Sequence, residues 1–203
     1  GGQNGSVVTF NNVEDSTAIL RSFTIMNGYV EAVSEPGGGI SISSSNPSII
    51  NVNIKENSSF FAGGIFLDSS SAIIKDVEIS FNEALVAGGG IMMNHSNPSL
   101  QNVNIDNNIA NGAAGIFLIA SNPTISNVLI SDNVAESLGG GIFISNSGGV
   151  NINLSGYVIN NNTANKGGGI TVECVGEDSV FVSDMIITSN SAIGNNSYGG
   201  GIY

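Results

Sequence analysis

Gly88-Gly89-Gly90-Ile91 is the stretch of sequence that decides the fold, because its glycine–isoleucine pair recurs along the whole chain. Successive isoleucines are separated by 25 to 32 residues. A repeat of this length predicts a solenoid, in which each copy buries its apolar residues only against its neighbours. The copies of the pair are Gly39-Ile40, Gly64-Ile65, Gly90-Ile91, Gly115-Ile116, Gly141-Ile142, Gly169-Ile170 and Gly201-Ile202.

The apolar residues within each copy alternate with polar ones, as in Ile40-Ser41-Ile42 and Val103-Asn104-Ile105. This period of two is the pattern of β-strands that bury one face. A copy has room for about three short strands, which is one coil of a parallel β-helix. We therefore predict an all-β fold, a single parallel β-helix domain over residues 1–203 with about seven coils of about 25 residues each.

A column of asparagines recurs at a fixed distance from the glycine–isoleucine pair. Asparagine tolerates the left-handed backbone of a tight corner, and its amide hydrogen-bonds neighbouring groups. Stacked about 4.8 Å apart, such amides predict an asparagine ladder from coil to coil. In the first coil Gly28 takes the same place. The column consists of Asn57, Asn82, Asn108, Asn133, Asn162 and Asn190.

These motifs resemble those of right-handed parallel β-helix proteins in the pectate-lyase-like superfamily. The likeness rests on Gly-Gly-[Gly/Ala]-Ile, on Ile-x-x-Asn, and on the Ser-Asn-Pro motifs at 45–49, 96–100 and 121–125. The repeats are most similar to those of polymorphic outer-membrane-protein passengers and bacterial surface β-helix proteins. The resemblance implies the right-handed coil. It leaves function open, because the superfamily includes adhesins, autotransporter passengers, and polysaccharide lyases and hydrolases.

The charge balance excludes some classes of partner. Lys and Arg number 4 against 16 Asp and Glu, a net charge of −12. Such a chain repels nucleic-acid phosphates and anionic membrane surfaces. No apolar run is long enough to span a membrane, and the single Cys174 excludes an intrachain disulfide. The low share of charged residues, 10%, and the abundance of Asn and Ser are typical of extracellular or cell-surface proteins.

A column of large apolar residues follows the isoleucine of the repeat and consists of Phe66, Met92, Phe117 and Phe143. By strand alternation these side chains face outward, so the pattern predicts an exposed stripe that binds a partner or ligand. Two alternatives remain open. Another part of the protein or a neighbouring subunit covers the stripe, or the stacked side chains simply stabilise the sheet.

Acidic residues form a second candidate site. Asp76, Glu78 and Asp106 are expected on one face within about 10 Å, where carboxylates can bind calcium or act as acid and base. The alternative is a solvated polar face. A longer corner with Glu173, Glu177 and Asp178 is another possible cation site. No other cofactor is expected.

The sequence contains few residues suited to catalysis. It has one histidine, His95, and the catalytic motifs of the superfamily's polysaccharide enzymes are missing. We therefore expect a non-catalytic, secreted bacterial module with a structural or adhesive role, which binds a surface glycan or itself. The alternative is a polysaccharide-binding or polysaccharide-degrading domain. Because Gly201-Ile202-Tyr203 begins a further coil, we expect a fragment of a longer chain or a unit that stacks end to end.

Overall fold

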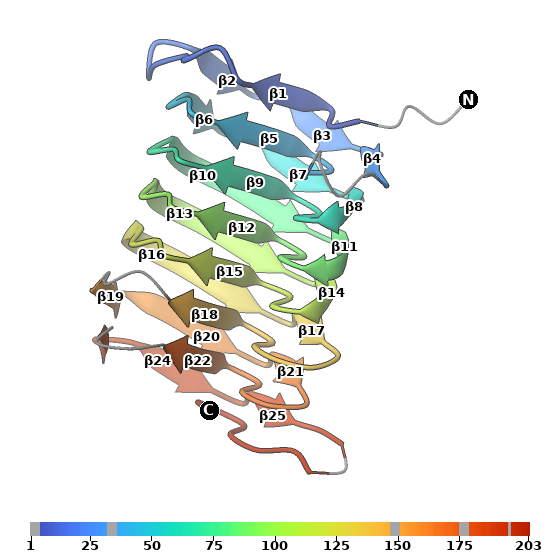
Figure 1. Ribbon diagram of the computed structural model, residues 1–203, viewed down its shortest axis with the longest axis vertical. Helices are drawn as coiled ribbons and strands as arrows, with labels where there is room; N and C mark the ends of the chain where they lie inside the picture. The colour runs from blue at the N-terminus through green and yellow to red at the C-terminus, as the bar shows by residue number, and fades with distance from the viewer. Residues whose placement is uncertain (1–4, 32–35, 147–150, 175–178, 195) are drawn as a thin grey trace.

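The computed structural model is a solenoid of stacked β-coils, with the two termini at opposite ends (Figure 1). It describes residues 5–31, 36–146, 151–174, 179–194 and 196–203. Each coil contributes strands to three parallel sheets, here called the front, back and side sheets after their places in Figure 1. Within the described residues there is no helix, and so none that is long and apolar enough to cross a membrane.

The first strand of each coil belongs to the front sheet. This strand begins with the isoleucine of the glycine–isoleucine pair, and in the first coil Val8 takes the place of that isoleucine. The sheet has seven strands, and the solenoid completes about 6 turns, in agreement with the predicted number of coils. The strands are β1 (Val8–Phe10), β5 (Ile40–Ser43), β9 (Ile65–Asp68), β12 (Ile91–Asn94), β15 (Ile116–Ile119), β18 (Ile142–Asn146) and β22 (Ile170–Cys174).

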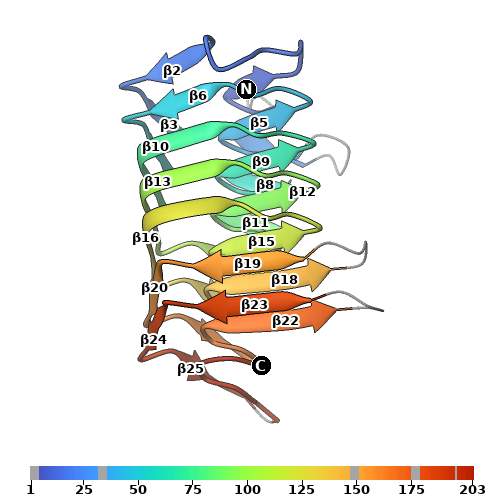
Figure 2. The ribbon, with the colours of Figure 1, turned by 90° about the vertical axis from the view of Figure 1, so that its left-hand side faces the viewer.

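The back sheet follows the front strand in each coil. Its strands are β2 (Ile19–Arg21), β3 (Thr24–Met26), β6 (Ser48–Ile50), β7 (Asn53–Lys55), β10 (Ile73–Ser80), β13 (Ser99–Asp106), β16 (Thr124–Ser131), β20 (Tyr157–Asn160) and β24 (Ile186–Thr188). Two further strands, β19 (Ile152–Ser155) and β23 (Val180–Ser183), pair with each other in the two coils where the sequence is longer (Figure 2).

The side sheet closes each coil before the next glycine corner. Its strands are β4 (Tyr29–Val30), β8 (Ser58–Phe61), β11 (Glu83–Ala87), β14 (Ile109–Gly112), β17 (Val134–Ala135), β21 (Thr163–Ala164) and β25 (Ser191–Ala192). Its inward residues are mostly alanines, among them Ala84, Ala110 and Ala135. These small side chains let the side sheet lie close to the other two.

The core is a stack of aliphatic side chains that runs the length of the solenoid. The isoleucines of the repeat are fully buried from Ile40 to Ile170, as the alternation predicts. Each contacts its equivalents in the neighbouring coils, so the column is continuous. Full burial of one such side chain stabilises the fold by roughly 1.5–3 kcal/mol, and the stacked columns are the main source of stability.

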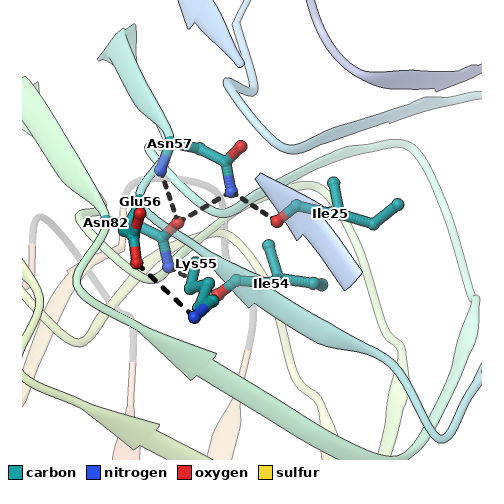
Figure 3. A network of polar contacts seen from close by, with 6 residues as sticks. All are labelled: Ile25, Ile54, Lys55, Glu56, Asn57 and Asn82. Carbon is teal, nitrogen blue, oxygen red and sulfur yellow. Dashed lines mark hydrogen bonds and ion pairs between the residues drawn. The ribbon is translucent and has the colours of Figure 1, made fainter. Parts of the chain in front are cut away.

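The asparagine ladder is present and lies inside the corner between the back and side sheets. In Figure 3, Oδ1 of Asn82 accepts hydrogen bonds from the backbone N and Nδ2 of Asn57, at 3.1 and 2.9 Å. Nδ2 of Asn57 also donates to the carbonyl of Ile25, and Nδ2 of Asn82 donates to that of Ile54. The same pattern repeats to Asn190. Each amide therefore ties three successive coils together.

The residue with a left-handed backbone conformation at this corner is not the asparagine itself. The residue before it has positive φ in each coil, for example Glu56 at 54° and Phe81 at 55°. The prediction of a left-handed asparagine was wrong by one position, because the asparagine must turn its amide into the core. Gly28 stands in the ladder column as predicted, and its N donates to Oδ1 of Asn57. Its φ is not positive, so the glycine is needed for space.

Candidate ligand-binding groove

A groove of about 740 Å³ lies on the outer face of the front sheet, near its N-terminal end. Residues of β1, β5, β9 and β12 form its floor, and the segments that precede β1 and β5 contribute to its rim. The volume is within the range of about 300–1,000 Å³ that is typical of ligand sites. The lining residues are Gly5, Ser6, Thr9, Asn11, Pro36, Ser41, Ser43, Phe66, Asp68 and Asn94.

Hydroxyl and amide groups dominate this lining. Ser41 lies in register with Thr9, and Ser43 lies in register with Asp68, which in turn pairs with Asn94. Nδ2 of Asn94 donates to Oδ1 of Asp68 over 2.7 Å, which fixes both side chains. Because each step to the next coil is about 4.8 Å, these polar groups form a regular array along the solenoid axis.

Phe66 is the aromatic residue of the groove and also the first residue of the predicted stripe. The register pairs Phe66 with Met92, Met92 with Phe117, and Phe117 with Phe143, so the four side chains form one column. The rings of Phe117 and Phe143 stack with centroids 5.0 Å apart and an angle of 11° between their planes. The column therefore extends from the polar groove toward the C-terminal coils.

The stripe is less exposed than the alternation predicts, and the prediction was wrong for Met92. Met92 exposes only 8% of its surface, and Phe66, Phe117 and Phe143 are half-buried. The glycine corners explain the burial. The backbone at Gly88 lies so close that an added Cβ would be 2.8 Å from Cβ of Met92, and Gly139 approaches Phe143 of its own coil in the same way. Phe66 is approached instead by Gly37 of the preceding coil. The stripe is thus covered in part by the glycine corners beside it.

The three carboxylates of the predicted calcium site lie on β10 and β13 of the back sheet. Asp76 accepts a hydrogen bond from Asn102 at 2.8 Å, and half-buried Asp106 accepts one from Asn107 at 2.6 Å. Glu78 is exposed. Across the described part of the chain, no three His, Cys, Asp or Glu residues gather in a group that could hold a metal ion. Calcium has no part in the function proposed below.

Asp76 instead belongs to a second, exterior column in the back sheet. Its members all have positive φ and mark the bend in the back strand of each coil. Nδ2 of Asn127 donates to Asn102, which donates to Asp76. The acidic corner predicted at Glu173 is described only in part, because Glu177 and Asp178 lie outside the described residues. The exterior column is Ser22, Asn51, Asp76, Asn102, Asn127, Gly156 and Asp184.

Most groove residues were not predicted as site residues from the sequence. Ser43, Asp68 and Asn94 occupy the second outward position of the front strand, and attention to the first outward position alone left them out. That second column is polar in these three coils, apolar at Ile119, and polar again at Ser145 and Glu173. Its polarity alone therefore does not distinguish the groove from the rest of the front face.

The three parallel sheets, the glycine corners and the internal asparagine ladder define a parallel β-helix. The family described as a right-handed β-helix region matches residues 3–172, which is most of the chain. The chain therefore belongs to the right-handed β-helix family, as the repeat motifs suggested. Neither the comparison with curated proteins nor the comparison with solved structures gave a match. Because family membership defines the fold and not the chemistry, the function must be inferred from the groove.

Proposed function

We propose that this β-helix is a non-catalytic module that works outside the cell and binds a neutral oligosaccharide in the groove of the front sheet. The observation that carries the proposal is the lining of the groove. Hydroxyls and amides from four successive coils surround the single aromatic ring of Phe66. An adhesive role follows from this, since a rigid solenoid that holds a surface glycan attaches its bearer to that surface.

The groups in the groove suit a sugar chain. Ser41, Ser43 and Asn94 can each donate and accept hydrogen bonds, as sugar hydroxyls do. Phe66 offers an apolar surface to the C–H face of a sugar ring. Asp68 and the net charge of −12 oppose an acidic polysaccharide, and so favour a neutral one.

The lining supports binding rather than bond cleavage. Glycoside hydrolysis canonically uses two carboxyl groups on either side of the scissile bond. Asp68 is the one titratable side chain among the residues that line the groove, and its Oδ1 accepts a hydrogen bond from Asn94. These groups can hold and orient a ligand, and no second acid faces Asp68 from the lining.

Self-association remains a second proposal for the partner, and one observation weighs against it. The stripe of Phe66 to Phe143 is half-buried, so it offers little apolar area to another copy.

Replacing Phe66 with alanine is expected to weaken oligosaccharide binding by roughly tenfold, the effect of losing one aromatic stacking contact. The measurement is isothermal titration calorimetry with a panel of neutral oligosaccharides. Reducing-sugar release is followed in parallel with neutral and acidic polysaccharides, with and without calcium. We expect binding without turnover.

Phe143→Ala is the matched control, because Phe143 occupies the same column, is similarly half-buried and does not line the groove. Its removal should leave binding unchanged. Binding that is lost in Phe143→Ala and kept in Phe66→Ala would move the ligand to the stripe. A panel with no binder, or robust release of sugar, would overturn the proposal.

A further inference from the structure

A second, smaller pocket of about 190 Å³ lies on the side sheet, on β4, β8 and β11. It shares no lining residue with the groove of the front sheet. Its volume equals roughly six water molecules at about 30 Å³ each, which suits one long side chain and not an oligosaccharide. The walls include two aromatic rings, one leucine and two carboxylates, those of Tyr29, Phe60, Leu85, Glu31 and Glu83.

The aromatic and acidic groups of this pocket are held in place by contacts within the sheet. The phenol of Tyr29 donates a hydrogen bond to Oε1 of Glu31 over 2.7 Å. This hydrogen bond raises the pKa of the Tyr29 phenol, because the bond is lost when the phenol gives up its proton. Phe60 packs edge to face against Phe61, with ring centroids 5.0 Å apart. The pocket is therefore built before any ligand arrives.

The charged side chains that line the pocket are both acidic. None of the side-sheet strands contains a lysine or an arginine. Glu31 and Glu83 line the pocket, and Glu136 lies four coils further along from Glu31 on the same sheet face. An aromatic pocket with carboxylates at its rim attracts a cation, both through the ring faces and through the charges.

The surface beside the pocket is apolar. Leu85 exposes 66% of its surface, and the two residues in register with Glu83 on the next strands, Ile109 and Val134, expose 52% and 44%. Isolated exposed residues are common, but here Leu85 lies two residues from Glu83 on β11, and Ile109 and Val134 follow Glu83 on the next two strands, so the three form one patch. Phe81, two residues before Glu83, is also exposed although its φ is 55°, a conformation that costs an L-residue about 1–2 kcal/mol.

From these observations we propose that the side sheet binds a protein segment through a lysine or arginine side chain inserted into the pocket of Tyr29, Phe60, Glu31 and Glu83. Apolar residues of the same segment lie along Leu85, Ile109 and Val134. Charge complementarity commits the occupant to a basic partner, since the sheet supplies only negative charge and apolar surface. This binding surface is independent of the glycan groove.

The probe is the peptide Lys-Ser-Leu-Ser-Leu-amide with fluorescein on its N-terminal amine and the lysine side chain free, which presents its lysine and leucines on one face when extended. Fluorescence anisotropy should show saturable binding to the intact chain. Glu83→Gln should weaken it by roughly tenfold, as expected for the loss of a charge-assisted contact. A peptide with acetylated lysine should not bind. The matched control is Glu78→Gln, which removes another exposed carboxylate, from the back sheet, and should bind the peptide like the unmodified chain.

Three results would overturn the proposal. Equal weakening by Glu83→Gln and Glu78→Gln would show only long-range attraction to the net charge. Undiminished binding of the acetyl-lysine peptide would show a purely apolar contact. If sedimentation shows a dimer that Glu83→Gln dissociates, the occupant is a second copy of the chain. Loss of oligosaccharide binding in Phe66→Ala has no bearing on these outcomes, so the two proposals fail separately.

Discussion

Replacing Asn108 with alanine is expected to destabilise the solenoid by about 3–6 kcal/mol, because several buried polar groups lose their partners at once. Oδ1 of Asn108 accepts from the N and Nδ2 of Asn82, and its Nδ2 donates to Ile79 O and to Oδ1 of Asn133. The side chain is fully buried, so water cannot replace these bonds. Each orphaned group costs about 1–3 kcal/mol.

Urea unfolding followed by circular dichroism measures this loss as a lower midpoint of the transition. Asn111→Ala is the control, since Asn111 is an exposed asparagine on the next strand of the same coil. The free energy of unfolding of Asn111→Ala should stay within about 0.5 kcal/mol of that of the unmodified chain, as is usual for surface positions. A loss in Asn108→Ala no larger than that in Asn111→Ala would mean that the ladder does not stabilise the fold.

The fold was predictable because a solenoid presents the same environment once per coil. Each column of the sequence reports one environment repeatedly, so the isoleucine and asparagine positions could be read without knowledge of distant contacts. The left-handed corners were harder to place. Glu56, Phe81 and Asn107 share no side-chain chemistry, and only their position before the ladder asparagine unites them.

The site was less predictable than the fold, because it depends on features that break the repeat. The rim of the groove includes Gly5, Ser6 and Pro36, which lie outside the aligned columns. The burial of Met92 also could not be read from alternation, since it depends on how closely the backbone at Gly88 passes. Outward direction in a strand is therefore not the same as exposure.

Gly90, the last glycine before Ile91, is expected to tolerate no side chain. A Cβ there would lie 2.7 Å from the carbonyl oxygen of Gly115 and 2.7 Å from Cγ2 of Ile105. Real Cβ atoms essentially never approach other atoms within 3.0 Å, so the coils must move apart. Gly90→Ala should therefore lower the free energy of unfolding by about 1–3 kcal/mol, as overpacked core substitutions do.

Gly112→Ala is the matched control for this prediction. A Cβ at Gly112 would meet Oγ of Ser137 at 3.5 Å, an ordinary contact, and its φ is not positive. Alanine there should be neutral or stabilise by about 0.4–1 kcal/mol, because it restricts the unfolded chain. Thermal unfolding measures the change in Tm for both variants. If close packing is the reason for Gly90, Tm falls in Gly90→Ala and is unchanged or rises in Gly112→Ala.

The chain itself offers an internal comparison for Gly90. One position earlier in the repeat, Ala114 replaces the glycine in one coil and is fully buried, although a Cβ at the equivalent Gly89 would lie 2.6 Å from a carbonyl oxygen, so the backbone of that coil adjusts to hold a methyl group. At the position of Gly90 every copy has glycine. An added methyl at Gly90 would also lie 3.2 Å from Nδ2 of Asn108. If Gly90→Ala leaves the free energy of unfolding unchanged, the coils can move apart without loss of stability. The predictions for Gly90→Ala and Asn108→Ala both assume a fixed distance between coils, and both would then lose that basis.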